Sequence, residues 1–288
     1  SGVIIDPESL FDVQIKRIHE YKRQLLNILH VIYLYNNILE HPELPFAPRT
    51  ILLAGKAAPG YYMAKLIINL ANDVARVINS DPAVQGRLNL VFVPNYNVSV
   101  AEKIIPATDI SQHISTAGTE ASGTGNMKFI LNGALIQGTM DGANIEIAEE
   151  VGRENIFTFG LSSDEVSILA ESGYNPSVSY KNNPVLREAL SKINTGYFNR
   201  DKPHLYNDLY NSLVFEDKYM LLEDFASYDE CRQKVMNTWK DQNIWTRMSI
   251  LNTAGSGKFS SDRTIAEYAK DIWGLEAVTV ELQGKKVR

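Results

Sequence analysis

The chain has 288 residues, of which 44% are hydrophobic, 22% are charged and one is a cysteine. These values fit a soluble globular protein with a large core, and they exclude a disordered, collagen-like or disulfide-dense chain. The net charge of −6 offers no attraction to nucleic acid, and no apolar run is long enough for a membrane span. With no secretory signal and no cysteine pair, we expect a reducing, cytoplasmic location.

The first 160 residues alternate short apolar segments with amphipathic ones. We expect strands at residues 11–15, 51–54, 88–93, 135–138 and 155–159, and helices at 20–39, 63–78, 99–105 and from 126 onward. The residues between 106 and 125 are interpreted as a small-residue loop. Such alternation predicts βαβ units and an α/β, Rossmann-like, doubly wound and mostly parallel sheet.

After about residue 160 the strand pattern ends and only helices are predicted. Their expected ranges are 164–171, 183–193, 205–213, 228–240, 245–254 and 261–273. We therefore divide the chain into an α/β part, residues 1–160, and a helical part, residues 161–288, that packs on the same domain.

The stretch from Thr116 to Phe129 is the most informative for chemistry. Small residues and three glycines precede a predicted helix, and successive free N–H groups in such a loop can bind an anion. Glu120 would then be an acceptor suited to a ligand hydroxyl. The alternative is a tight helix entry whose small residues only permit close packing.

Lys128 lies near the end of this stretch and has apolar neighbours. A lysine buried among them would have a lowered pKa, as an amine needs to form a Schiff base with an aldehyde such as pyridoxal phosphate. The phosphate group of that cofactor would suit the anion-binding loop just upstream. The alternative is a lysine whose amine reaches solvent.

A second cluster of basic residues lies at a predicted strand-to-helix turn. It includes Lys16, Arg17 and Lys22, in a chain that is acidic overall. Ligands of open α/β sheets bind at the carboxyl ends of parallel strands, and Arg17 can bind two phosphate oxygens at once. A solvated helix start is the alternative, but cations there oppose the helix dipole.

Two other positions have simpler interpretations, and no metal site is predicted. Asp141 is expected to cap the helix that follows it. Tyr96 is expected either to pack against a flat ring or to fill the core. The five histidines are scattered without the spacing of metal ligands.

Long segments of the chain resemble the C-terminal, pyridoxal-phosphate-binding domain of the glycogen phosphorylase (α-glucan phosphorylase) family. The matching segments are residues 11–27, 55–68, 102–135, 138–160 and 245–273, and EASGTGNMK at 120–128 is the most specific. The resemblance implies the second domain of a two-domain (GT-B) glycosyltransferase fold. It also implies that the family's N-terminal domain is absent here.

The resemblance implies a set of cofactor-binding residues. Lys128 matches the lysine that carries pyridoxal 5′-phosphate. Gly123 and Thr124 match residues whose backbone amides meet the cofactor phosphate, and Lys16 matches its cationic partner. Tyr96 matches an aromatic residue beside the cofactor.

Substrate-binding residues also follow from the resemblance. Arg17 and Lys22 match the pair that holds the substrate phosphate, and Tyr21 matches a tyrosine that contacts the sugar. Four residues match those that line the glucosyl site: Glu120, Ala121, Ser122 and Gly123.

The family's reaction is the reversible phosphorolysis of a terminal α-1,4-linked glucose by orthophosphate, with retention, to glucose 1-phosphate. The implied partners are glycogen or another α-1,4-glucan, and full-length members are usually homodimers. An alternative for this chain is a fragment that binds cofactor but lacks a complete glucan cleft. EASGTGNMK argues against a nucleotide-sugar glycosyltransferase. An aminotransferase is disfavoured because no aspartate is placed for the pyridine nitrogen.

Overall fold

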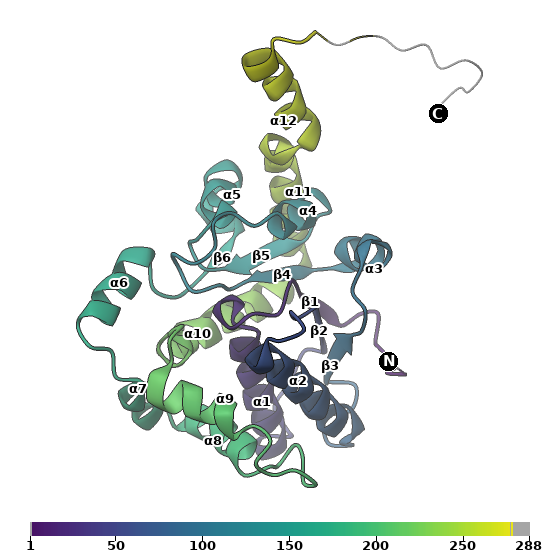
Figure 1. The fold of residues 1–288 in the computed structure, drawn as a ribbon. Helices are drawn as coiled ribbons and strands as arrows, with labels where there is room; N and C mark the ends of the chain where they lie inside the picture. The colour runs from purple at the N-terminus through teal and green to yellow at the C-terminus, as the bar shows by residue number, and fades with distance from the viewer. Residues whose placement is uncertain (1, 277, 279–288) are drawn as a thin grey trace.

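The computed structural model describes residues 2–276 and residue 278, and its centre is a parallel sheet (Figure 1). In the described residues six strands pair in the order β3-β2-β1-β4-β5-β6, with every neighbouring pair parallel. The strands are β1 Leu10–Ile15, β2 Arg49–Ala54, β3 Leu88–Val93, β4 Ile110–His113, β5 Leu135–Gly138 and β6 Phe157–Thr158. The expected α/β, doubly wound parallel sheet is therefore confirmed.

Strand β4 was not predicted, although it lies at the centre of the sheet. Three of the four residues in its sequence, ISQH, are polar, so it lacks the continuous apolar run of β2 and β3. All four residues are nevertheless buried, and Gln112 hydrogen-bonds within the core to Asp12 and Tyr228. The strand order reverses between β1 and β4, where an open α/β sheet forms its ligand crevice.

Alternation along the strands separates two apolar layers. Leu53 and Leu90 face a core shared with α1 (Gln24–Glu40), α2 (Tyr62–Ser80) and helices of the C-terminal half. Leu52 and Ile136 face the other core, covered by α4 (Gly125–Leu131) and α5 (Ala143–Val151). Figure 1 shows these helices on opposite sides of the sheet. Successive side chains along a strand point to opposite faces of the sheet, so neighbouring residues such as Leu52 and Leu53 belong to different cores.

The first predicted helix begins later than expected. Residues Glu20–Lys22 form a short 3-10 turn (η1), and Arg23 then adopts a left-handed conformation with φ of 55° before α1 starts. This break turns the Arg23 guanidinium inward, where it is fully buried. Further short segments are α3 Val98–Ile104, η2 Ile105–Ala107 and η3 Arg153–Asn155.

Beyond β6 the described residues contain helices and no strand, as predicted. They are α6 Ser163–Glu171, α7 Pro176–Asn182, α8 Pro184–Asn194, α9 Asn207–Asn211, η4 Ser212–Glu216, α10 Leu221–Trp239, α11 Gln242–Gly255, η5 Ser256–Phe259, α12 Ser261–Glu267 and η6 Tyr268–Trp273. Helix α7 was not predicted, and α10 begins seven residues before the expected start. The division into residues 1–160 and 161–288 remains a prediction.

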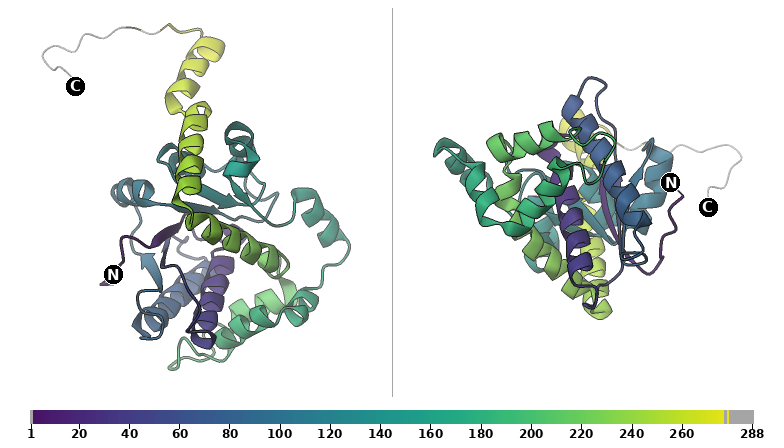
Figure 2. Two further views of the ribbon diagram at one scale, coloured as in Figure 1. Left: turned by 180° about the vertical axis from the view of Figure 1, so that it is seen from behind. Right: turned by 90° about the horizontal axis from the view of Figure 1, so that it is seen from below.

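The C-terminal helices differ in what they contact. Helix α10 lies against the sheet, whereas α12 extends away from the rest of the molecule (Figures 1 and 2). Ile265, Ile272 and Trp273 on that extension are exposed. In the described part of the chain, no helix has the length and apolar character needed to cross a membrane.

Candidate functional site

Three loops meet at the carboxyl ends of β1, β4 and β5. Residues 16–22 follow β1, residues 114–124 follow β4, and residues 139–142 follow β5. The Thr116 N–H donates to Tyr21 O over 3.0 Å, and the Ala143 N–H donates to Ser122 O over 2.8 Å. These bonds join the two segments singled out from the sequence at the switch point of the sheet.

Glu120 is the centre of this arrangement. Its carboxylate accepts from Lys22 Nζ at 2.6 Å and from Ser115 Oγ at 3.0 Å. Burial raises the pKa of Glu120, but the hydrogen bonds from Lys22 and Ser115 and the charges of Lys16 and Lys22 together outweigh it and leave the pKa lowered. Burial likewise lowers the pKa of Lys22, but its interactions with Glu120 and Tyr21 together outweigh burial and raise that pKa. Both groups are therefore charged at neutral pH.

Asp141 supports the Glu120 loop instead of capping a helix. Its Oδ2 accepts the N–H groups of Thr119 at 3.2 Å and Glu120 at 2.8 Å. The expected capping role is wrong, because Gly142 is the N-cap of α5 and no side chain caps that helix. Gly142 has φ of 53°, and a Cβ there would lie 2.5 Å from Ser122 O. Only glycine permits this approach of the two loops.

Lys16 is partly buried at the end of β1. Burial, and then the charge of Lys22, lowers its pKa to about 8. It lines a cavity of about 10 Å³ together with Gly123 and the buried His113, whose pKa burial holds well below its usual value. An anion beside Lys16 would compensate the two neighbouring ammonium groups.

Gly123 and Thr124 present backbone N–H groups just before α4. Neither N–H has an acceptor in the described structure, and Thr124 caps α4 without a side-chain hydrogen bond. This arrangement is consistent with the expected anion-binding loop.

Lys128 is exposed, so the expectation of a buried lysine is wrong. Helix α4 has seven residues and turns Asn126, Phe129 and Ile130 inward, which leaves Lys128 on the outer face. Its apolar neighbours in sequence therefore do not surround it in space. Lys128 instead lines a cavity of about 610 Å³ that it shares with the half-buried Tyr96.

The remaining predicted site residues lie near this edge with few contacts. Arg17, Ala121 and Ser122 are exposed, and no hydrogen bond of the Arg17 side chain occurs among the described residues. The Tyr21 ring lies 4.6 Å from Lys22 Nζ. The structure thus gathers Lys16, Tyr21, Lys22 and residues 120–124 around one edge, with Lys128 and Tyr96 lining a separate cavity.

Arg23 belongs to the same basic segment but is buried, and its role in positioning the site was not predicted from the sequence. Its Nη1 forms an ion pair with Asp224 at 2.6 Å, and its Nε donates to Ile114 O at 2.7 Å. It therefore fixes the backbone that follows β4. Its partner lies 201 residues away, so no local pattern could have revealed the pair.

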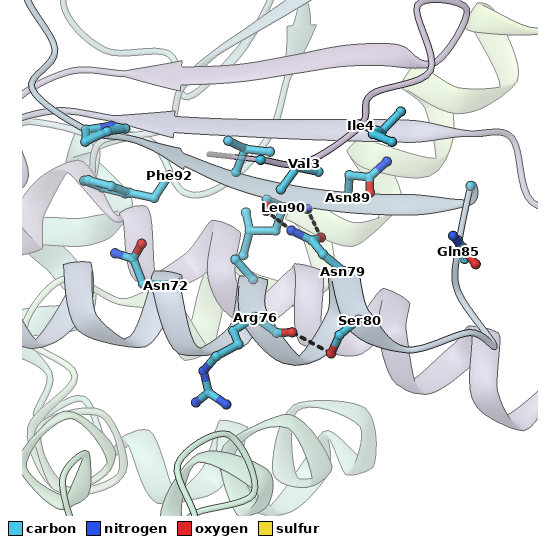
Figure 3. A pocket seen from close by; sticks show the side chains of 15 residues that line it. Val3, Ile4, Asn72, Arg76, Asn79, Ser80, Gln85, Asn89, Leu90 and Phe92 are labelled. Carbon is cyan, nitrogen blue, oxygen red and sulfur yellow. Dashed lines mark hydrogen bonds between the residues drawn. The ribbon is translucent and has the colours of Figure 1, made fainter.

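A further cavity lies elsewhere and is lined by none of the predicted site residues. It has about 800 Å³ and lies between α2, β3 and the N-terminal residues (Figure 3). Asn79 there pairs with both backbone groups of Leu90, at 2.7 and 3.0 Å. In the part of the chain that the structure describes, no cluster of acidic, histidine or cysteine side chains could hold a metal ion.

Comparison with known proteins gives a consistent family match. Residues 1–275 match the family described as carbohydrate phosphorylase. The chain is 54% identical to the liver form of glycogen phosphorylase from Bos taurus over 97% of its length, and 56% identical to the muscle form from Homo sapiens over 95%. It is 54% identical to glycogen phosphorylase from Synechocystis over 98%. It spans only about a third of these relatives, 33%, 32% and 33% respectively.

Proposed function

The chain belongs to the carbohydrate phosphorylase family, and we propose that it is the cofactor-bearing C-terminal domain of an α-glucan phosphorylase. The proposed reaction is the reversible phosphorolysis of a terminal α-1,4-linked glucose of glycogen or a similar glucan. Orthophosphate is the co-substrate and glucose 1-phosphate is the product, with retention. A cytoplasmic location and a homodimeric full-length form are part of the same proposal and rest on the resemblance.

The observation that carries this proposal is the convergence of three loops at the switch point. They bring two lysines, an ionised glutamate and two free backbone N–H groups to one edge of the sheet. Two phosphate groups placed close together repel each other unless cations compensate them. The cluster of Lys16, Arg17 and Lys22 can supply that compensation.

Pyridoxal phosphate is the proposed cofactor, and the residues assigned to it line two separate cavities. Lys128 and Tyr96 line one cavity of about 610 Å³, a size typical of small-molecule sites. Lys128 would carry the cofactor, and Lys16, Gly123 and Thr124 would hold its phosphate. When bound, the cofactor supplies a phosphate group that can exchange a proton with the substrate phosphate. Lys16 faces only about 10 Å³ of space, so a phosphate beside it must displace part of the 114–124 loop.

The protein groups have separable roles in the proposed reaction. Arg17 is free to bind two oxygens of orthophosphate, since its exposed side chain has no competing partner among the described residues. Lys22 contributes a point charge, and phosphate must compete with Glu120 for it. Glu120, held by Asp141 through its backbone, is left to accept a hydroxyl of the glucosyl unit.

An assay of the natural full-length protein tests this function. Glycogen and orthophosphate should yield glucose 1-phosphate, and Arg17→Ala should raise KM for phosphate by about tenfold or more while cofactor content stays unchanged. The matched control is Arg76→Ala, on the exposed face of α2, which should leave KM unchanged. No glucose 1-phosphate from the cofactor-loaded protein, or an unchanged phosphate KM in Arg17→Ala, would contradict the proposal.

A further inference from the structure

Two buried glutamines contact the basic loop that follows β1, residues 16–22. Gln14 lies on β1 and is fully buried, and Gln24, the first residue of α1, is 1% exposed. No role was predicted for either residue from the sequence. Burying an amide is unfavourable unless its hydrogen bonds are made within the protein, so the partners of these two amides show what they do.

The Gln24 side chain binds the backbone on either side of Ile18. Its Nε2 donates to Arg17 O at 3.0 Å, and its Oε1 accepts from the His19 N–H at 3.4 Å. The Ile18 N–H between them donates to Lys56 O, in the segment after β2, at 3.1 Å. This stretch of backbone is therefore held from two elements, while the exposed side chain of Arg17 extends from it.

Gln14 holds the other end of the loop. Its Nε2 donates to Lys22 O at 3.1 Å, and its Oε1 accepts from Asn27 Nδ2, on α1, at 3.1 Å. Asn27 is itself fully buried. The bond from Asn27 fixes the orientation of the Gln14 amide, so that Lys22 O meets the NH₂ group of this amide and not its oxygen.

These bonds reach the two residues that are proposed to bind the substrate phosphate. Gln24 binds the main-chain carbonyl of Arg17, and thus fixes the backbone from which that guanidinium extends. Gln14 does the same for Lys22. A loop without such bonds would have to be ordered when phosphate binds, and this loss of conformational freedom weakens affinity.

We propose that Gln24 and Gln14 are positioning residues of the substrate-phosphate site. They fix the backbone of Arg17 and of Lys22 before phosphate binds, and neither glutamine touches the phosphate. This inference rests on the proposed function, because it takes these two cations as the ligands of orthophosphate. It adds that phosphate affinity depends on two amides buried at the base of the loop.

Steady-state kinetics of the natural full-length protein, loaded with pyridoxal phosphate, tests this role. Gln24→Met keeps the size of the side chain but removes both bonds to the loop. It should raise KM for phosphate about tenfold and change kcat by about twofold or less, while KM for glycogen and cofactor content stay unchanged. Gln14→Met should act in the same way through Lys22. The matched control is Asn79→Leu, which removes two bonds to the backbone of Leu90 at the C-terminal end of α2 and should leave KM for phosphate unchanged.

The outcomes separate this inference from the proposed function. Wild-type protein that makes no glucose 1-phosphate would contradict the proposed function itself. Active enzyme whose phosphate KM is the same in wild type, Gln24→Met and Gln14→Met would overturn the positioning role alone. Equal rises in the KM values for phosphate and glycogen would also overturn it, because they would indicate a general loss of structure.

Diffraction from wild-type crystals tests the same role without a substitution, so a folding defect cannot obscure it. In crystals of the natural full-length protein grown with and without phosphate, Arg17 O should stay within hydrogen-bond distance of Gln24 Nε2. Lys22 O should likewise stay bonded to Gln14 Nε2. A loop whose carbonyl groups leave the two glutamines when phosphate binds would overturn the proposal.

Discussion

At the carboxyl end of the sheet the cations Lys16, Arg17 and Lys22 lie in one loop, whereas at the amino end Arg49 and Arg232 lie within a strand and a helix. Lys22 and its partner Glu120 keep 13% and 19% of their side-chain surface exposed. Arg232 and its partner Asp12 keep 1% and 0%. The two ion pairs therefore differ in role because they differ in burial. The exposed pair can exchange partners with an arriving anion, whereas the buried pair joins α10 to β1.

The largest effect on stability is expected from neutralising Asp12 at the amino end, compared with neutralising Glu120 at the carboxyl end. Asp12→Asn leaves Arg232 buried and unpaired beside Arg49, so it should lower the free energy of unfolding by about 3–5 kcal/mol. Glu120→Gln leaves a partly solvated Lys22, so it should cost about 1 kcal/mol or less. Urea denaturation of both variants measures the difference. Equal losses would show that the two pairs are not as different as their burial indicates.

A smaller effect is expected from the glycine that joins two loops at the carboxyl end. Gly142→Ala places a Cβ 2.5 Å from Ser122 O at a φ of 53° and should cost about 2–4 kcal/mol. The matched control is Gly86→Ala, with φ of 75° and no atom within 4 Å of the new Cβ. It should cost only about 1 kcal/mol, the strain of the left-handed conformation. Thermal unfolding of both variants decides whether the close approach matters.

Two groups whose pKa values burial lowers, Lys16 and His30, should make the free energy of unfolding depend on pH in different windows. The pKa of Lys16 is lowered to about 8, so the unfolded chain binds more protons and stability should rise between about pH 8 and 10.5. The pKa of His30 is lowered to about 4, so stability should fall as pH drops from 6.5 toward 4. Lys16→Met should reduce only the alkaline change, and His30→Phe should reduce only the acidic one, to which the buried His113 also contributes. Unfolding free energies measured across both windows check this assignment.

Much of the fold was predictable because β2 and β3 contain continuous apolar runs, β1 alternates apolar with polar residues, and α2 is amphipathic. Strand β4 escaped prediction because its polar side chains are satisfied by distant partners, such as Gln112 with Tyr228, 116 residues away. Local periodicity cannot reveal partners of this kind. The same reason hid Arg23 and its partner Asp224.

The segments that form the candidate site were predictable from the sequence, but the burial and pairing of their side chains were not. The basic turn after β1 and the glycine-rich loop after β4 were both recognised, and the structure joins them through Lys22 and Glu120. The burial of Lys128 was predicted wrongly, because apolar neighbours in sequence lie on the opposite face of a short helix.

The most direct test of the central claim is covalent trapping of the cofactor. The natural full-length protein is loaded with pyridoxal phosphate, reduced with borohydride and mapped by peptide mass spectrometry. The account predicts one pyridoxyl adduct, on Lys128, that disappears in Lys128→Ala and persists in Arg17→Ala. An adduct on another lysine, or none after loading, would contradict the assignment of the carboxyl end as the cofactor site.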